Sequence, residues 1–304
     1  MKKYTIVTVV KIKGGHIWFD RMEEGIKRFA AETGHNAFLI GPPKAGENLQ
    51  DALVGEMIDK GVDALCVVPY FPQALEMNLG KAKRRGIVVI SHEASNQRNV
   101  DYNVEAFDNT EYGIHLMDHL AHYMGAEGKY AILLASLMAQ SHSEWSKAAL
   151  TRQRGHYPEM QLITRKIQSW EDITLAREKT LELLERYPDL RGILGISMTS
   201  TIGAGYAIDA RGRQNDVVFV GTGLVSGCKA QLLSGATNLI SFWDPADAGY
   251  AMNKLAVMVL QGDSIRSGVD LGAPGYHKMA VKGKILIGSA MIDVTKENMS
   301  QFTL

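Results

Sequence analysis

Aromatic and charged side chains occur together near the start of the chain. Lys11 and His16 are followed by two neighbouring rings, Trp18 and Phe19. Aromatic rings pack on the apolar C–H faces of a sugar, and charged groups form strong hydrogen bonds with its hydroxyls. This combination predicts binding of a sugar or a similar small polyol. The alternative is that Trp18 and Phe19 only cover the core at the start of a helix.

The same residue types recur in later loops. Glu93 follows the apolar run 87–91, and a carboxylate at the end of a buried strand needs a partner. The further candidates are Asp108, Ser141, His142, Ser197, Met198, Thr222, Trp243 and Asp244. Together with the first group, these residues form our predicted ligand-binding set.

Several of these residues also have a purely structural interpretation. Asp108 suits a helix N-cap, and so does Asp244, which precedes a proline that would take the first helical position. His16 and His142 would be solvated loop residues. For Glu93 the alternative is a salt bridge with a neighbouring Lys or Arg.

Motifs of catalytic and cofactor sites do not occur in the sequence. It contains no GxGxxG, P-loop, HExxH or GxSxG pattern. The two cysteines, Cys66 and Cys228, cannot form a structural zinc site alone, and Cys66 lies in an apolar run typical of a buried, inert thiol. We therefore expect no enzyme, no cofactor and no metal site.

The composition limits the possible partners. A chain of 304 residues suits two domains of about 150. The 33 basic and 33 acidic residues cancel, so net charge gives no reason to expect nucleic acid or an anionic membrane as a partner. Met1-Lys2-Lys3 resembles the start of a signal peptide, but the apolar stretch after it is too short. The protein is therefore either cytoplasmic or a mature form whose leader has been replaced by a start methionine.

The predicted elements explain how the candidate side chains could meet. Runs rich in β-branched residues alternate with helical segments that end at a glycine, such as strand 4–10, helix 18–33 and Gly34. The other predicted strands cover 36–40, 64–68, 87–91, 129–135, 161–165, 192–196, 217–220 and 238–242, with short strand-like runs in 278–294. This repetition predicts an α/β fold of two doubly wound parallel-sheet lobes. In such sheets ligands bind beyond the carboxyl ends of the strands, which is where the candidates fall.

Five segments follow one another in an order typical of a known family. They are Trp18-Phe19, the run GIVVISHE at 86–93, Asp108-Asn109 with Gly113, Phe242-Trp243-Asp244, and the run VTKEN at 294–298. With these segments the chain resembles, over nearly its whole length, the type I periplasmic sugar-binding proteins of ABC transporters. It resembles in particular the group that contains the ribose-, rhamnose- and autoinducer-2-binding proteins.

The resemblance implies which residues contact the ligand. The implied contacts are Lys11, His16, Trp18, Phe19, Glu93, Ser197 and Thr222. The family has an aspartate at the position of Glu93, and the autoinducer-2 group has an acid–amide pair where this chain has Ser141-His142. These departures predict a reshaped pocket. They leave the ligand open among aldoses, deoxy sugars, amino sugars and autoinducer-2-like molecules.

The resemblance also implies how the chain is divided. Residues 1–106 and 244–270 would form the N-terminal lobe, and residues 107–243 and 271–304 the C-terminal lobe. The chain would cross between the lobes through a three-segment hinge near 103–107, 242–243 and 271.

The implied function is capture of the ligand in an interlobe cleft by hinge closure, followed by presentation to an ABC import permease. We expect a periplasmic or otherwise extracytoplasmic monomer without its signal peptide, with a sugar and the permease as partners and no nucleic acid. The alternative is the ligand-sensing core of a lactose-repressor-type transcription regulator. A regulator would need an upstream helix-turn-helix, whereas the first predicted strand begins at about Tyr4.

Overall fold

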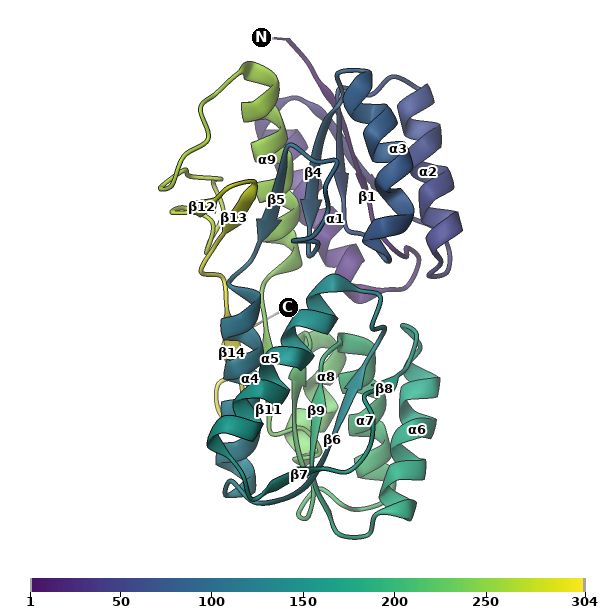
Figure 1. The fold of residues 1–304 in the computed structure, drawn as a ribbon, viewed down its shortest axis with the longest axis vertical. Coiled ribbons are helices and arrows are strands. Elements are labelled where there is room, and N and C mark those ends of the chain that lie inside the picture. The colour runs from purple at the N-terminus through teal and green to yellow at the C-terminus, as the bar shows by residue number, and fades with distance from the viewer. Residues whose placement is uncertain (1, 303–304) are drawn as a thin grey trace. The chain divides into compact units, whose positions relative to one another are not determined.

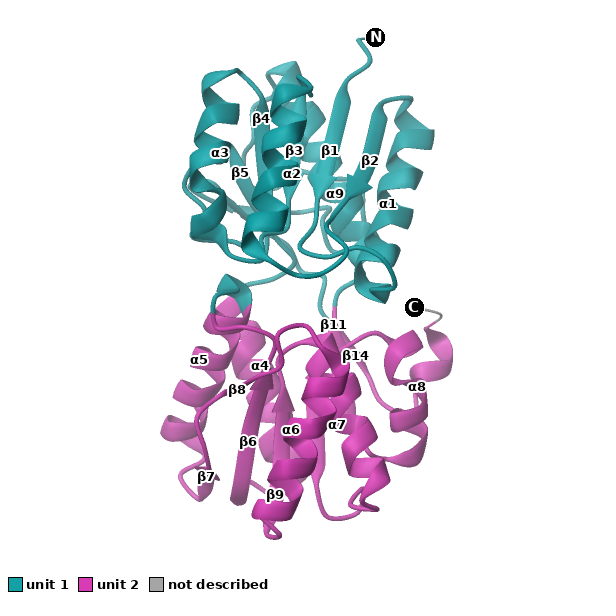
Figure 2. Cartoon of the chain, turned by 90° about the vertical axis from the view of Figure 1, so that its right-hand side faces the viewer, with its two compact units in different colours: residues 1–108, 138–141, 243–291 teal, residues 109–137, 142–242, 292–304 magenta. Residues whose placement is uncertain are grey.

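The computed structural model describes residues 2–302, which form two compact units (Figure 2). Unit 1 contains the described residues up to 108, residues 138–141 and residues 243–291. Unit 2 contains residues 109–137, 142–242 and the described residues from 292 onward. Each unit is an α/β domain with its own seven-stranded sheet, as the alternation of strands and helices predicts.

Unit 1 is built on a sheet with the strand order β12-β13-β5-β4-β3-β1-β2. The strands are parallel except for β12, which runs antiparallel to β13. The strands are β1 (Thr5–Val9), β2 (Asn36–Ile40), β3 (Ala64–Val67), β4 (Val88–His92), β5 (Tyr102–Glu105), β12 (Ala280–Lys282) and β13 (Ile285–Ile287). The helices are α1 (Ile17–Thr33), α2 (Glu47–Asp59), α3 (Pro72–Arg84) and α9 (Pro245–Gln261).

Alternate residues of each central strand face different helices. Val7 and Val9 of β1 pack into an apolar cluster with residues of α2 and α3. Thr8, which points the other way, contacts Asn253 of α9 through its hydroxyl at 3.2 Å. On that side α1 packs closely on α9. The absence of a side chain at Gly25 permits this, since a Cβ atom there would collide with the main chain of Ala246. Burial on both faces explains why these strands read as continuous apolar runs.

One buried amide holds the carboxyl ends of β1 and β3 in unit 1. Gln50 of α2 donates from Nε2 to the carbonyls of Val9 and Val68, at 3.3 and 2.8 Å. Its Oε1 accepts from the main-chain N–H of Tyr70 at 2.8 Å. These bonds satisfy main-chain groups where the ladder stops, and so they fix the loops that follow both strands.

Unit 2 repeats this plan with the strand order β14-β11-β10-β9-β6-β7, and β8 also pairs with β6. Only β14 is antiparallel to its neighbour, β11. The strands are β6 (Gly128–Leu134), β7 (Met160–Leu162), β8 (Ile167–Gln168), β9 (Leu190–Gly195), β10 (Val218–Thr222), β11 (Leu239–Phe242) and β14 (Ile292–Val294). The helices are α4 (Asn109–Met124), α5 (Gln140–His156), α6 (Ile173–Arg186), α7 (Met198–Ala210) and α8 (Val225–Ser234), with a 3₁₀ turn at Met299–Gln301 (Figure 1).

The C-terminal part of the chain is divided differently from the expectation. Residues 271–291 belong to unit 1, not to the C-terminal lobe, and the third crossing lies between Met291 and Ile292 rather than near Leu271. The reason is strand pairing, because β13 extends the unit 1 sheet beside β5 and only β14 joins unit 2. β13 pairs with the short strand β5, which is not an apolar run in the sequence.

Candidate functional site

The first candidate group lies where β1 ends and α1 begins, in unit 1. Lys11 follows β1 by two residues, and His16 is the N-cap residue of α1. The ring centroids of Phe19 and His16 are 4.9 Å apart. Lys11 Nζ lies 5.9 Å from the centroid of the Phe19 ring. Lys11 is only 5% exposed. The structure therefore brings a buried cation and an aromatic ring together at the carboxyl end of β1.

Glu93 brings a carboxylate to the same group. It directly follows β4, is 7% exposed and has a φ of +58°, a left-handed conformation that is uncommon for residues other than glycine. Its Oε2 lies 4.0 Å from Lys11 Nζ and accepts a hydrogen bond of 3.3 Å from Ser141 Oγ. The salt bridge that was the structural alternative for Glu93 is thus present, and its partner is itself a candidate residue. Backbone strain of this kind is typical of functional sites.

His92, the last residue of β4, is buried beside Glu93 but does not provide a second positive charge. Burial lowers its pKa below the ordinary value, and the attraction of Glu93 only partly opposes this. Its Nδ1 lies 2.6 Å from the carbonyl of Val104, which can only accept, so Nδ1 carries the proton of the neutral ring. The charged partner of Glu93 in this group is therefore Lys11 and not His92.

Trp18 and Trp243 form an aromatic cluster behind this group. Their rings meet edge to face, with centroids 4.7 Å apart and an angle of 77° between the planes. The ring of Trp243 also has edge contacts with His92 and Phe107, at 5.8 and 5.3 Å. Trp243 is 2% exposed and Trp18 is 5% exposed. Trp18 thus helps to cover the core, as the structural alternative states.

Asp244 and Asp108 have partners within unit 1. Asp244 caps α9 by accepting from the N–H of Ala246, and its two oxygens accept from the guanidinium of Arg21 at 3.0 and 2.7 Å. The N-cap interpretation of Asp244 is therefore confirmed. Asp108 precedes α4 and lies 3.7 Å from Lys282 Nζ. Asp244 thus has a structural role, whereas the ion pair of Asp108 with Lys282 is exposed.

In unit 2, Ser197 and Met198 lie at the start of α7, after β9. Ser197 caps the helix by accepting from the N–H of Ser200 at 3.2 Å, and its hydroxyl also contacts the Ser200 hydroxyl at 2.7 Å. Met198 is buried in the first turn. The serine hydroxyl therefore has a complete structural role at the carboxyl end of the sheet.

Thr222 and His142 are also held by neighbours in unit 2. The hydroxyl of Thr222, the last residue of β10, lies 2.8 Å from the hydroxyl of Tyr112, which donates to the carbonyl of Ser241 at 2.7 Å. His142 is a buried residue of α5, with its ring 5.7 Å from that of Trp145. The interpretation of His142 as a solvated loop residue is therefore wrong, because α5 begins before it.

Two residues with a clear part in these groups carried no signal in the sequence. Arg21 looks like an ordinary exposed helix residue, and its partner Asp244 is 223 positions away. Tyr112 has apolar neighbours on α4 and reads as a core residue, whereas its hydroxyl connects β10 with β11. Both assignments depend on long-range packing.

The comparisons with known proteins agree with the fold. The model of the periplasmic binding protein domain matches residues 6–264. The chain belongs to this family. Its type I fold of two parallel-sheet lobes is the one that the sequence predicts.

Two sugar-binding relatives have low sequence identity to this chain but align with most of it. The D-allose-binding periplasmic protein of Escherichia coli is 23% identical over 82% of both chains. The D-apiose import binding protein of Actinobacillus succinogenes is 23% identical over 94% of this chain and 88% of its own.

Solved structures match the fold over its whole length. An ABC transporter solute-binding protein of Clostridium phytofermentans with bound L-rhamnose has a TM-score of 0.89 at 21% identity, covering 99% of this chain and 98% of its own. LsrB of Clostridium saccharobutylicum in complex with AI-2 has a TM-score of 0.90 at 17% identity, covering 99% of this chain and 100% of its own. At these identities the structures establish the fold alone.

Proposed function

We propose that this protein captures a monosaccharide or similar small polyol and presents it to an ABC import permease. The observation that carries the proposal is the group of Lys11, Phe19 and Glu93, which is a buried ion pair beside an aromatic ring at the carboxyl ends of β1 and β4. Carboxyl ends of parallel strands are where ligands bind in doubly wound sheets. The names of the relatives, which include allose and apiose binding proteins, support the same class of ligand.

The spacing of the ion pair suits a hydroxyl group. The 4.0 Å between Lys11 Nζ and Glu93 Oε2 exceeds the length of a hydrogen bond. A sugar hydroxyl both donates and accepts, so one hydroxyl can donate to Glu93 and accept from Lys11. The ring of Phe19 offers an apolar surface next to these groups. Trp18 and His16 complete the part of the proposed ligand set that lies in unit 1.

The proposed place of action is outside the cytoplasmic membrane, with the protein as a monomer and without catalysis. The family is named for periplasmic proteins, and the relatives described above are binding proteins. Within residues 2–302, no helix combines the length and the apolar character needed to cross a bilayer. No observation favours the transcription regulator as an alternative.

Calorimetry with a panel of sugars tests the proposal. The panel contains D-allose, D-apiose, D-ribose, L-rhamnose and autoinducer-2, and a free amino acid serves as the negative control. We expect one-to-one binding of at least one panel member in the micromolar range or tighter. Folded protein that binds no member of the panel, and whose melting temperature none of them raises, would contradict the proposed ligand class.

A further inference from the structure

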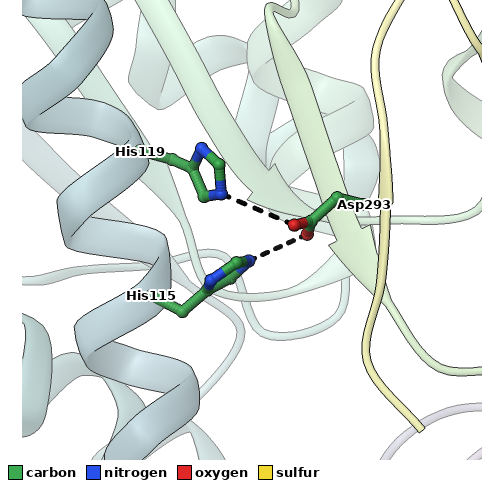
Figure 3. A group of neighbouring side chains, drawn as sticks. All are labelled: His115, His119 and Asp293. Atoms are coloured by element: carbon green, nitrogen blue, oxygen red, sulfur yellow. Dashed lines mark hydrogen bonds and ion pairs between the residues drawn. The ribbon is translucent and has the colours of Figure 1, made fainter.

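Two histidines and an aspartate converge at a partly exposed position of unit 2. His115 and His119 lie on α4, and Asp293 is the middle residue of β14 (Figure 3). His115 Nε2 lies 2.9 Å from one oxygen of Asp293, and His119 Nε2 lies 3.5 Å from the other. All three side chains are about one-third exposed. Solvent and small ions can therefore reach them.

The local structure explains this convergence. Residues four apart share one face of a helix, so His115 and His119 are neighbours, with ring centroids 4.4 Å apart. Val294 of β14 is fully buried, and strand alternation turns Asp293 to the opposite side from it. Asn298 holds the end of the strand by donating to the carbonyl of Asp293 at 3.1 Å. The pairing of β14 with β11 and the bond from Asn298 thus hold the main chain of Asp293 in place.

The spacing of the ligand atoms suits a small divalent ion. Imidazole nitrogens bind zinc at about 2.1 Å, so two ligands of a tetrahedral ion are about 3.4 Å apart. One ligand atom from each residue, an imidazole nitrogen or a carboxylate oxygen, lies within 4.8 Å of the other two. The two nitrogen–oxygen distances of 2.9 and 3.5 Å bracket the tetrahedral value. Two imidazoles and one carboxylate also leave a coordination position open, and this ligand set is suited to Zn²⁺.

The charge state of the aspartate is the one that a metal requires. An aspartate side chain is ionised at neutral pH, because its ordinary pKa is about 3.9. Without an ion, the same three residues form a hydrogen-bonded triad, which is the simpler explanation that an experiment must exclude.

We propose that His115, His119 and Asp293 bind one Zn²⁺ ion or a similar transition metal ion. The ion fastens β14 to α4 within unit 2. This has a structural consequence, because β14 pairs with β11 over only three residues and immediately follows the crossing between Met291 and Ile292. The site is independent of the sugar-binding proposal, since it shares no residue with that ligand set.

Titration of the full chain with ZnCl₂ tests this site directly. The protein carries no affinity tag and is freed of metal with EDTA before calorimetry. We expect one Zn²⁺ per chain and no binding of Mg²⁺, which prefers oxygen ligands. Zinc at about a hundred times its dissociation constant should raise the melting temperature by about 5 °C. Absence of zinc binding at a concentration of about 100 µM overturns the proposal.

His119→Gln is the decisive variant, because His119 makes the longer contact and its loss disturbs the triad least. We expect zinc affinity to fall by at least about 10- to 100-fold, the loss that even an outer-shell partner causes. His277→Gln is the matched control, since His277 pairs with Asp270 at 2.8 Å in unit 1 and belongs to no group of three such ligands among residues 2–302. Equal zinc affinity of His119→Gln and the wild type overturns the proposal.

A footprint on the wild-type protein gives an answer even if the variant does not fold. Diethyl pyrocarbonate modifies accessible imidazoles, and mass spectrometry locates the modified residues. We expect zinc to protect His115 and His119 while the exposed His122 and His156 stay reactive. Protection of none of these residues, or of all four equally, contradicts the site.

Discussion

The carboxyl ends of the two sheets carry different chemistry. In unit 1, the loops after β1 and β4 present a buried ion pair, Lys11 and Glu93, beside the ring of Phe19. In unit 2, the candidates Ser197 and Thr222 are hydroxyls engaged with neighbours in the same unit. The carboxyl ends of the two sheets thus hold charged and aromatic groups in unit 1 and short hydroxyls in unit 2.

This difference indicates that the two groups of side chains have different roles, one in ligand binding and the other in stability. A buried ion pair gains from additional hydrogen bonds that satisfy its remaining donors and acceptors, and a polyol can supply them. A helix cap is already satisfied, and truncating it mainly weakens the helix. We therefore expect substitutions in unit 1 to act on ligand affinity and substitutions of the unit 2 hydroxyls to act on stability.

The largest effect is expected for Trp18→Ala. The ring belongs to the proposed ligand set and packs on Trp243, so its loss should weaken sugar binding by about 2–4 kcal/mol and also lower stability. Calorimetry and thermal unfolding on the same protein separate the two losses. Trp170→Ala removes a tryptophan that is 46% exposed in unit 2 and serves as the control. Unchanged affinity in a folded Trp18→Ala protein would remove this residue from the ligand site.

Glu93→Gln should have the next largest effect. It keeps the size of the side chain and removes the charge, and hydrogen bonds to charged groups contribute about 1.5–3 kcal/mol. We expect a neutral sugar to bind about 10- to 100-fold more weakly, and an amino sugar to lose more because an ion pair is also lost. Glu56→Gln, in an exposed pair with Lys60, is the matched control. A lower melting temperature with full affinity would assign Glu93 to structure alone.

Ser197→Ala tests the unit 2 side of the comparison. The variant loses the bond from Ser200 N–H and should cost about 1 kcal/mol of stability, with ligand affinity changed less than about twofold. Chemical denaturation and calorimetry give the two quantities. A tenfold loss of affinity would show that this hydroxyl serves the ligand as well, and the proposed division of work would fail.

The smallest effect at neutral pH belongs to His92. Its folded-state pKa is lowered by burial, so the neutral ring stabilises unit 1 above the ordinary histidine pKa of about 6.5, and this stability is lost as pH falls below that value. Unfolding measured between pH 7.5 and pH 5 should therefore show a decline that is shallower in His92→Gln. An identical pH dependence in the variant would mean that another group causes the decline.

Much of the architecture can be predicted from the sequence, because it depends on local patterns. Apolar runs and glycine stops locate the main strands and helices, and their alternation predicts two doubly wound sheets. Cys66 likewise reads as a buried thiol from its neighbours, and burial raises its pKa to about 12. The proline after Asp244 marks the helix that this residue caps.

Pairings between distant segments were decided only by the tertiary structure. β5 and β13 are short, and their place in the unit 1 sheet follows from their pairing with each other across about 180 residues. The same holds for Lys11 with Glu93 and for Asp293 with the histidines of α4. Residue types and local spacing determine which elements form and which side chains can do chemistry. Which of those side chains meet depends on strand order and helix packing, and these are properties of the folded chain as a whole.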